Sequence, residues 1–337
     1  MRRNGRAVQP VRRHLSAVLF FVMICAAACF VSSADVHAKT HKVKTAADWH
    51  NISKYKGGTF KLTKNIRLSN TKQYLTITKN RKYTIDLNGY KVYTTYAGKE
   101  LRSVCPLTIE KGTVVLKSSK YAKKKKGVLY STETAAVTVG GSAKFYLKSG
   151  AVVNDAVEFR SNMPTGIYLA NKARCYVQGA SMVQSIGNAV TMFDSSALYL
   201  SGHPFLRAGA SKLTGQFTHY GSGINITSPK CKLSLKGGTI GTKASPPAVV
   251  TNFLGSYEYQ QSGDFPIYDK NGKTLKAAKG YKFVDAKGKT VPISSSFDSF
   301  GTNAVYFLTL AGGNPDRRLT TDVTSSDGYY SIYIVKK

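Results

Sequence analysis

The chain has 337 residues, of which 49 are Lys or Arg and 17 are Asp or Glu, so its formal net charge is +32. This length allows a substantial core. Three cysteines beyond residue 38 are too few and too widely spaced for a disulfide framework, and after residue 38 no apolar run is long enough to span a membrane.

Residues 1–38 have the pattern of a secretory signal peptide. Arginines precede an apolar run over 15–31, and Val36-His37-Ala38 supplies small residues for cleavage. We therefore expect a secreted, extracellular protein whose mature chain starts at Lys39. Because the run approaches spanning length, a retained membrane anchor is the other interpretation.

The mature chain keeps a strong positive charge. The leader holds five Arg and one Asp, so its removal leaves 44 basic and 16 acidic residues, a net charge near +28. Such a balance in an exported protein favours an anionic wall polymer or an acidic glycan as partner, and nucleic acid is not expected. The other interpretation is a lysine-rich surface that only keeps the protein soluble.

The first element of the mature chain is a predicted short helix. Thr45-Ala-Ala-Asp48 is a capping-box pattern, and Trp49, Ile52 and Tyr55 recur at helical spacing. Trp49, the only tryptophan, would be a core residue beside this cap or, in the other interpretation, a sugar-stacking residue.

The next feature is the stretch Tyr-Thr-Ile-Asp-Leu-Asn-Gly-Tyr at 83–90. Its apolar residues alternate as in a half-buried strand, and Asn88-Gly89 follows. By itself this is a strong hairpin signal. The alternative is a corner in a chain that keeps winding forward.

An internal repeat decides between these alternatives. Each copy reads apolar-x-apolar, a polar corner, apolar-x-apolar, a glycine and a third apolar piece; the clearest copies are 135–153, 165–183, 188–206 and 222–240. The first strands of six copies begin at Leu75, Leu107, Val137, Ile167, Val190 and Ile224. Their spacings are 32, 30, 30, 23 and 34 residues, which suits turns of a three-sided solenoid with loops inserted at corners. Asn88-Gly89 then occupies a corner, where glycine permits a positive φ.

At this point the residues resemble a known class. "TAADW", "GGTFKLTKNIRL" and "YTIDLNGYKV", between residues 45 and 92, look like the start of secreted bacterial right-handed parallel β-helix proteins of the pectin-lyase-like class. The resemblance covers roughly residues 43–253. It implies an all-β, right-handed parallel β-helix over 39–254 whose open N-terminal end is plugged by the predicted helix. It implies no particular activity, because this architecture serves lyases, glycosidases and adhesins alike.

The repeat pattern ends after residue 253. Residues 255–337 are expected to form a small antiparallel β module. Segments 267–275 and 283–291 repeat at 16 residues, each with an Asp-x-x-Gly turn between strands. Two further strands are expected at 305–310 and 330–335.

The repeat frame also predicts which side chains face outward. On the second strand of three successive coils it places Tyr146, Tyr176 and Tyr199, with Ser234 next. Adjacent coils lie about 4.8 Å apart, so these rings would form a ladder, either a platform for sugar rings or a self-stacked column that stiffens the sheet. The flanking outward residues are mostly cationic: Lys144, Arg174, Lys232, Lys148, Gln178 and Lys236.

Two further columns follow from the same frame. The outward residues of the first strand, expected to be structural, are Thr76, Thr108, Thr138, Tyr168, Thr191 and Asn225. The frame places Cys105, Cys175 and Cys231 inside different coils, where buried free thiols rather than nucleophiles or ligands are expected.

The enzyme alternative is a polysaccharide lyase or glycoside hydrolase acting on acidic polysaccharides. A lyase would use clustered carboxylates, with Ca²⁺, and a basic residue; a glycosidase would use facing carboxylates. The few acidic residues within the coils give little support for a lyase or for a glycosidase. The weak catalytic candidates are Asp155, Glu158, Asp194 and His219.

The sequence-based expectation is thus a monomeric, extracellular binding or adhesion protein held at the cell wall by charge. No cofactor or metal is expected outside the lyase alternative. The anionic ligand would contact the tyrosine ladder with Lys144, Lys148 and Arg174, and a second anchor would be the lysine run 123–126, that is Lys123, Lys124, Lys125 and Lys126.

Overall fold

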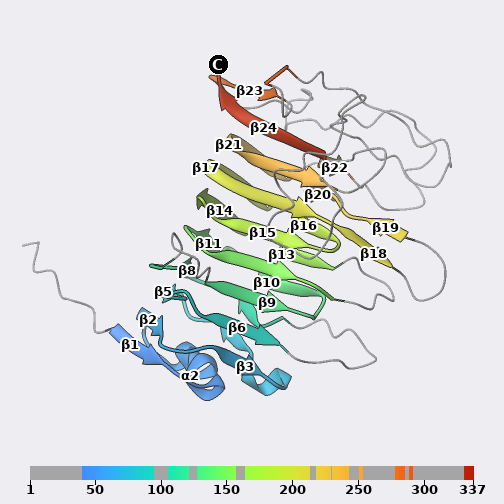
Figure 1. Cartoon of the computed structure of the whole chain (residues 1–337). Coiled ribbons are helices and arrows are strands. Elements are labelled where there is room, and N and C mark those ends of the chain that lie inside the picture. Colours follow the sequence, from blue (N-terminus) through green and yellow to red (C-terminus); the bar gives the residue numbers. More distant parts are fainter. Residues whose placement is uncertain are drawn as a thin grey trace, which may run out of the picture. The chain divides into compact units, whose positions relative to one another are not determined.

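The computed structural model describes residues 40–94, 105–120, 127–156, 164–212, 218–228, 230–242, 250–252, 278–284, 288–290 and 330–337 (Figure 1). All of them belong to one compact unit, Thr40–Lys337. The expected signal peptide lies outside the described residues, as does the expected boundary at 254/255, so both stay predictions.

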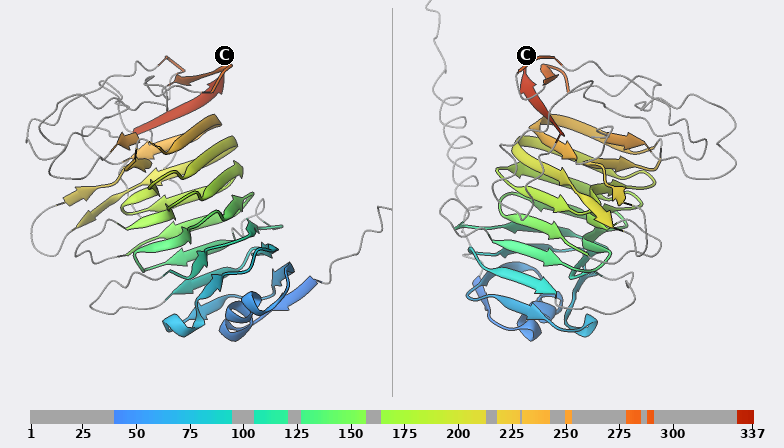
Figure 2. Two further views of the ribbon diagram at one scale, coloured as in Figure 1. Left: turned by 180° about the vertical axis from the view of Figure 1, so that it is seen from behind. Right: turned by 45° about the vertical axis from the view of Figure 1, so that its right-hand side comes forward.

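Short strands stack into three columns, and the chain visits the columns in turn (Figures 1 and 2). The first column is a seven-stranded parallel sheet. Its members are β4 (Leu75–Ile77), β7 (Leu107–Ile109), β10 (Ala135–Val139), β13 (Thr165–Leu169), β16 (Asn188–Met192), β20 (Ile224–Ile226) and β22 (Val250–Asn252).

The second and third columns belong to one fifteen-stranded sheet, because β17 (Ala197–Ala208) and β21 (Lys232–Thr242) run through the corner between them. The second column holds β1 (Thr40–Val43), β2 (Gly58–Leu62), β5 (Lys82–Asp86), β8 (Thr113–Lys117), β11 (Lys144–Leu147), β14 (Arg174–Gly179) and the first halves of β17 and β21. The third holds β3 (Ile66–Leu68), β6 (Lys91–Thr94), β9 (Val128–Ser131), β12 (Ala151–Asn154), β15 (Met182–Ser185) and the second halves of β17 and β21. The fold is therefore a three-sided parallel β-helix, as predicted.

Asn88-Gly89 is a corner and not a hairpin. β5 pairs with β2 and β8, whereas β6 pairs with β3 and β9. Asn88 has φ 48° and Gly89 has φ 81°, the left-handed region that the tight change of direction requires. The Asn88 side-chain amide donates to the Leu62 carbonyl at 3.0 Å, which links this corner to the previous coil.

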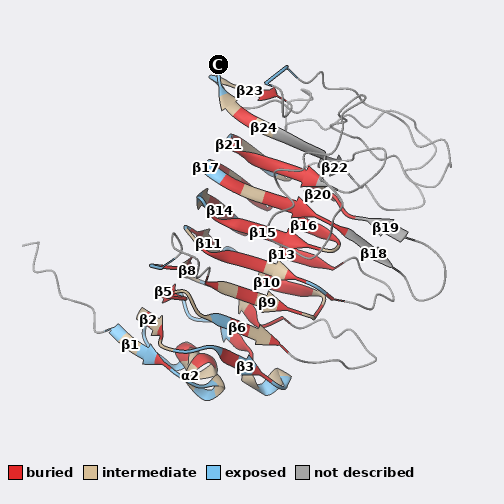
Figure 3. Ribbon diagram, viewed as in Figure 1, coloured by how far each residue is buried: buried red, intermediate tan, exposed pale blue. Residues whose placement is uncertain are grey.

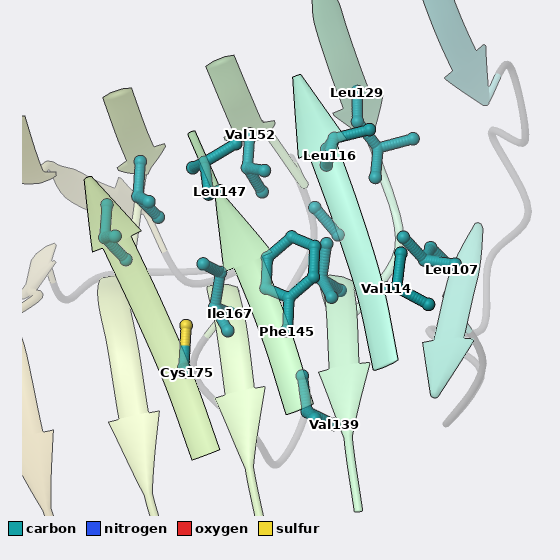
Figure 4. Packing of buried hydrophobic residues seen from close by; sticks show 14 of the residues in the cluster. Leu107, Val114, Leu116, Leu129, Val139, Phe145, Leu147, Val152, Ile167 and Cys175 are labelled. Atoms are coloured by element: carbon teal, nitrogen blue, oxygen red, sulfur yellow. The ribbon is translucent and has the colours of Figure 1, made fainter. Parts of the chain in front are cut away.

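The core fills the interior of the coil (Figure 3). In Figure 4 the labelled side chains of three columns, among them Leu116, Leu129, Phe145 and Ile167, converge on one another. All four are fully buried. Because the strands alternate with period 2, each contributes every second side chain to this interior.

A short helix lies at the N-terminal end. α2 (Ala46–Asn51) begins at the Thr45 capping box, as predicted, and continues into η1 (Ile52–Lys54). Trp49 is buried in the core cluster, and its indole N–H donates to the Pro106 carbonyl at 3.2 Å. These contacts confirm Trp49 as a core residue. Tyr55, in contrast, follows η1 and is 40% exposed, so it is not part of the buried helix face.

Antiparallel strands lie at the C-terminal end. β24 (Tyr330–Lys336) pairs antiparallel with both β21 and β23 (Tyr281–Val284), and Val284 forms an isolated antiparallel bridge with Thr290. The strands predicted near 283–291 and 330–335 are thus confirmed in their described parts. The segments 267–275 and 305–310 lie outside the described residues.

Three smaller elements complete the description. η2 (Thr71–Gln73) precedes β4, and β18 (Ala210–Lys212) forms an antiparallel pair with β19 (Thr218–Tyr220). Neither β1 nor β22 was among the six predicted copies of the repeat; each adds a strand to one end of its column.

Candidate functional site

The three predicted tyrosines form a stack on the outer side of the second column of strands. Tyr146, Tyr176 and Tyr199 are register partners in β11, β14 and β17. The first two ring centroids lie 4.3 Å apart with planes 4° from parallel, and the next two lie 4.6 Å apart at 9°. All three side chains are half-buried.

The stacking determines which part of each ring meets solvent. The neighbouring strands are displaced along the coil axis, so the rings lie one above another along that axis. Both faces of Tyr176 are covered by its neighbours. The ladder therefore presents ring edges along most of its length, and only its terminal rings have an outer face.

The column is electrostatically coupled. Burial raises the pKa of Tyr146, and the neighbouring Tyr176 raises it further through its charge and its hydrogen bond, while the Arg174 guanidinium opposes the increase. The protonated, neutral form of Tyr146 is therefore favoured, and the positive charge beside the ladder comes from the flanking Lys and Arg residues.

The flanking cations lie where the frame predicted them. Lys144 pairs in register with Arg174, on the N-terminal side of the tyrosines, and Lys148 follows β11 on the other side. Arg174 and Lys148 are exposed, and Lys144 is half-buried. Ala197 of β17 interrupts the column between Arg174 and Lys232.

The positive surface extends further than the predicted site. The strands of the second column contain eight Lys or Arg residues: Lys42, Lys61, Lys82, Lys117, Lys144, Arg174, Lys232 and Lys236. We call these eight residues, together with Lys148, the cationic face. Carrying the repeat frame back from residue 144 to residue 40 would have found its first four members.

Only one acidic residue occurs in these strands. Asp86 lies between Lys61 and Lys117 in the register, but it is only 4% exposed. Its carboxylate Oδ1 accepts hydrogen bonds from the backbone amides of Asn88 at 2.8 Å and Ser119 at 2.9 Å. The carboxylate therefore points into the corner, where its two hydrogen bonds stabilise the backbone conformation.

The outward residues of the first column of strands are uncharged, unlike those of the second column. Its outward residues align in register as predicted: Thr76, Thr108, Thr138, Tyr168, Thr191 and Asn225. Tyr168 lies beside Phe193 with centroids 4.8 Å apart, and its pKa is raised by burial and by the charge of Asp194.

The catalytic candidates are not brought together in the described residues. Asp155 follows β12, at the corner leading to the first column, and it accepts the Tyr130 hydroxyl at 3.1 Å. Asp194 lies in a different corner, between β16 and β17, where it accepts the Asn171 amide at 2.8 Å. Glu158 lies outside the described residues. Only the backbone of His219, in β19, is described.

The described part of the chain contains no group of three or more His, Cys, Asp or Glu residues that could hold a metal ion. Likewise, none of its helices is long and apolar enough to cross a bilayer. The lysine run 123–126 lies outside it, so its role as an anchor stays a prediction.

The three cysteines are free thiols. Cys105 and Cys175 are buried as predicted, and burial raises the pKa of both thiols. Cys231 is only half-buried, which corrects the prediction. It lies at the corner before β21, where it packs against the core cluster and its Sγ contacts the Ser196 Oγ at 3.7 Å and the Asp194 carbonyl at 3.6 Å.

Comparison of the chain with protein-family models, with curated proteins and with solved structures finds no match. A functional proposal therefore rests on the sequence, the fold and the geometry of the outer side of the second column.

Proposed function

We propose that this protein is exported and acts at the cell surface as a binding protein that holds an anionic polymer or acidic glycan along the cationic face. The observation that carries the proposal is the charge of this face: eight Lys or Arg residues in its strands against one buried carboxylate. The resemblance to secreted pectin-lyase-like surface proteins and the leader-like residues 1–38 support export.

The spacing of the charges supports a linear ligand. Eight strands, from β1 to β21, form the second column. At about 4.8 Å per strand they extend over roughly 34 Å. Within this column each strand carries at least one Lys or Arg, except the first half of β17. A polyanion lying along the axis would meet a cation at nearly every step.

Exposed charges of this kind act over a Debye length of about 8 Å at physiological salt, so the binding is expected to weaken as salt is added. The half-buried tyrosine edges between the two lines of cations would add hydroxyl groups as hydrogen-bond partners.

The test is calorimetric titration of the chain from Lys39 with long-chain polyphosphate, a polyanion without rings, at several salt concentrations. The face variant replaces Lys117, Lys144 and Lys148 by Gln. Because each ion pair between a surface lysine and the ligand is weak, removing three of them together should reduce the affinity roughly five- to twentyfold.

The matched control removes the same number of charges away from the face, by replacing Lys54, Lys64 and Lys72 by Gln. These three lysines are exposed and lie in η1, in the corner after β2 and in η2. We expect them to matter little. Equal losses in the two variants, or binding that does not respond to salt, would reject the cationic face as the binding surface.

A further inference from the structure

The tyrosine column ends differently at its two ends. In the preceding strand, β8, the register partner of Tyr146 is Val115, which is only 7% exposed. Beyond Tyr199 the register partner is Ser234 of β21. The ladder therefore stops at a short polar side chain on one side and at a buried aliphatic one on the other.

Tyr199 ends the ladder on the Ser234 side, so its outer ring face is the one that a ligand ring above Ser234 would cover. Among the described residues the only ring stacked on Tyr199 is Tyr176, on its opposite face. Ser234 has a single hydroxymethyl group where each of the three preceding strands has a phenol ring. A flat group placed above Ser234 would continue the stack at the same spacing.

Two cations flank this position on the same side of the sheet. Lys232 and Lys236 each lie two residues from Ser234 in β21, and both are exposed. Side chains two residues apart on one face are separated by roughly 7 Å, so both ammonium groups can reach a ring that lies above Ser234.

A described segment lies next to β21 in this region. The Ala278 amide donates to the Leu235 carbonyl at 3.1 Å, which brings residues 278–280 beside this half of the strand. These residues are small or exposed, and a Cβ atom added to Gly280 would meet nothing within 4 Å.

We infer that Tyr199, Ser234, Lys232 and Lys236 form a subsite for one sugar ring that carries a negative charge, an inference that rests on the proposed polyanion binding. The apolar face of a pyranose ring stacks on an aromatic face, and the two lysines neutralise its anionic group. The subsite would make the protein prefer acidic glycans over polyanions that lack rings.

The experiment compares two ligands and two variants by calorimetry. The ligands are a hyaluronan octasaccharide, which has acidic pyranose rings, and a polyphosphate of matched charge, which has none. Ser234→Tyr extends the ladder by one ring and fills the subsite. Thr84→Tyr adds a ring to the same outward column, two strands before Tyr146, and is the matched control.

Ser234→Tyr is expected to weaken hyaluronan binding about three- to tenfold, because one sugar ring can no longer stack on Tyr199, and to leave polyphosphate binding unchanged. Thr84→Tyr is expected to change neither. In saturation-transfer NMR, irradiation of the protein's aromatic protons should saturate sugar ring protons in the unaltered chain, and the Ser234→Tyr change should reduce this transfer.

Unchanged hyaluronan affinity in Ser234→Tyr, or an equal loss in Thr84→Tyr, would overturn the subsite. If the unaltered chain binds polyphosphate but not hyaluronan, the subsite is wrong while the proposed polyanion binding stands. If it binds neither ligand, both proposals fall. Circular dichroism of both variants checks that the β-helix is retained.

Discussion

At the scale of single residues, the Tyr130–Asp155 pair shows how a coil corner changes a side chain's chemistry. The Tyr130 hydroxyl donates to Asp155 Oδ2 at 3.1 Å. Burial, followed by the charge and the hydrogen bond of Asp155, raises the pKa of Tyr130 to about 12. This bond gives Asp155 a structural role in its corner.

The sign of the shift gives a pH prediction. The fold favours the protonated phenol, so the contribution of Tyr130 to stability is complete below pH 10, the ordinary tyrosine value, and is lost as the pH rises from 10 to 12. In a 295 nm titration, the difference between the unaltered chain and Tyr130→Phe should show one phenol ionising near pH 12. Asp155→Asn should lower this midpoint only partly, because burial is the larger cause. A midpoint at pH 10 would contradict the assignment.

At the scale of elements, the corners determine where each strand ends. Gly89, Gly150, Gly179, Gly202 and Gly237 recur at the corner between the second and third columns, and each has a positive φ. At these positions the backbone turns while strands of adjacent coils stay in register. A side chain would have to fit both the left-handed backbone and the coil below it.

A neighbouring pair of glycines in another corner tests this requirement. Gly141 has φ +56°, and a Cβ there would lie 2.5 Å from the Glu110 carbonyl oxygen of the preceding coil. Gly141→Ala should therefore lower the free energy of unfolding by about 1–3 kcal/mol. The control is Gly140→Ala, where the nearest atom to a Cβ is 4.0 Å away and the change should be below about 1 kcal/mol. Urea unfolding of the two variants measures both, and similar losses would argue against corner strain.

At the scale of the whole molecule, the described residues show different structures at the two ends of the coil. α2 carries Trp49 into the core at the N-terminal end. At the other end β24 adds antiparallel to β21, and Phe283 and Ile334 join the core cluster. A solenoid needs such ends because its terminal coils would otherwise expose apolar core and unpaired strand edges.

Adjacent residues of β24 test the C-terminal end. Ile334 is 4% exposed, whereas Val335 is half-buried and has the opposite parity in the strand. Ile334→Asn should cost about 2–5 kcal/mol of unfolding free energy through poorer packing and a buried amide, and should favour self-association on size exclusion. Val335→Asn should cost about 1 kcal/mol or less. If Val335→Asn were the more damaging change, the inward placement of Ile334 would be wrong.

Much of the fold could be predicted because its signals are local and repeated. The alternation around Phe145 and Tyr146 predicted that the first side chain points inward and the second outward, and Phe145 is buried while Tyr146 is half-buried. The repeat frame predicted that Tyr146, Tyr176 and Tyr199 share one column, and the register confirms it. The frame did not predict the extent of burial in the last coil, where Cys231 packs against the core cluster but is only half-buried.

Local sequence patterns predicted most of the strands, their inward and outward sides, the glycine corners and the N-terminal cap, because each depends on backbone geometry over a few residues. Only the folded coil establishes that the tyrosine rings stack face to face, that Asp86 turns away from the cationic face, and that β24 extends the sheet beyond β21. These features depend on contacts between residues far apart in the chain, and such contacts arise only when successive coils are laid on one another.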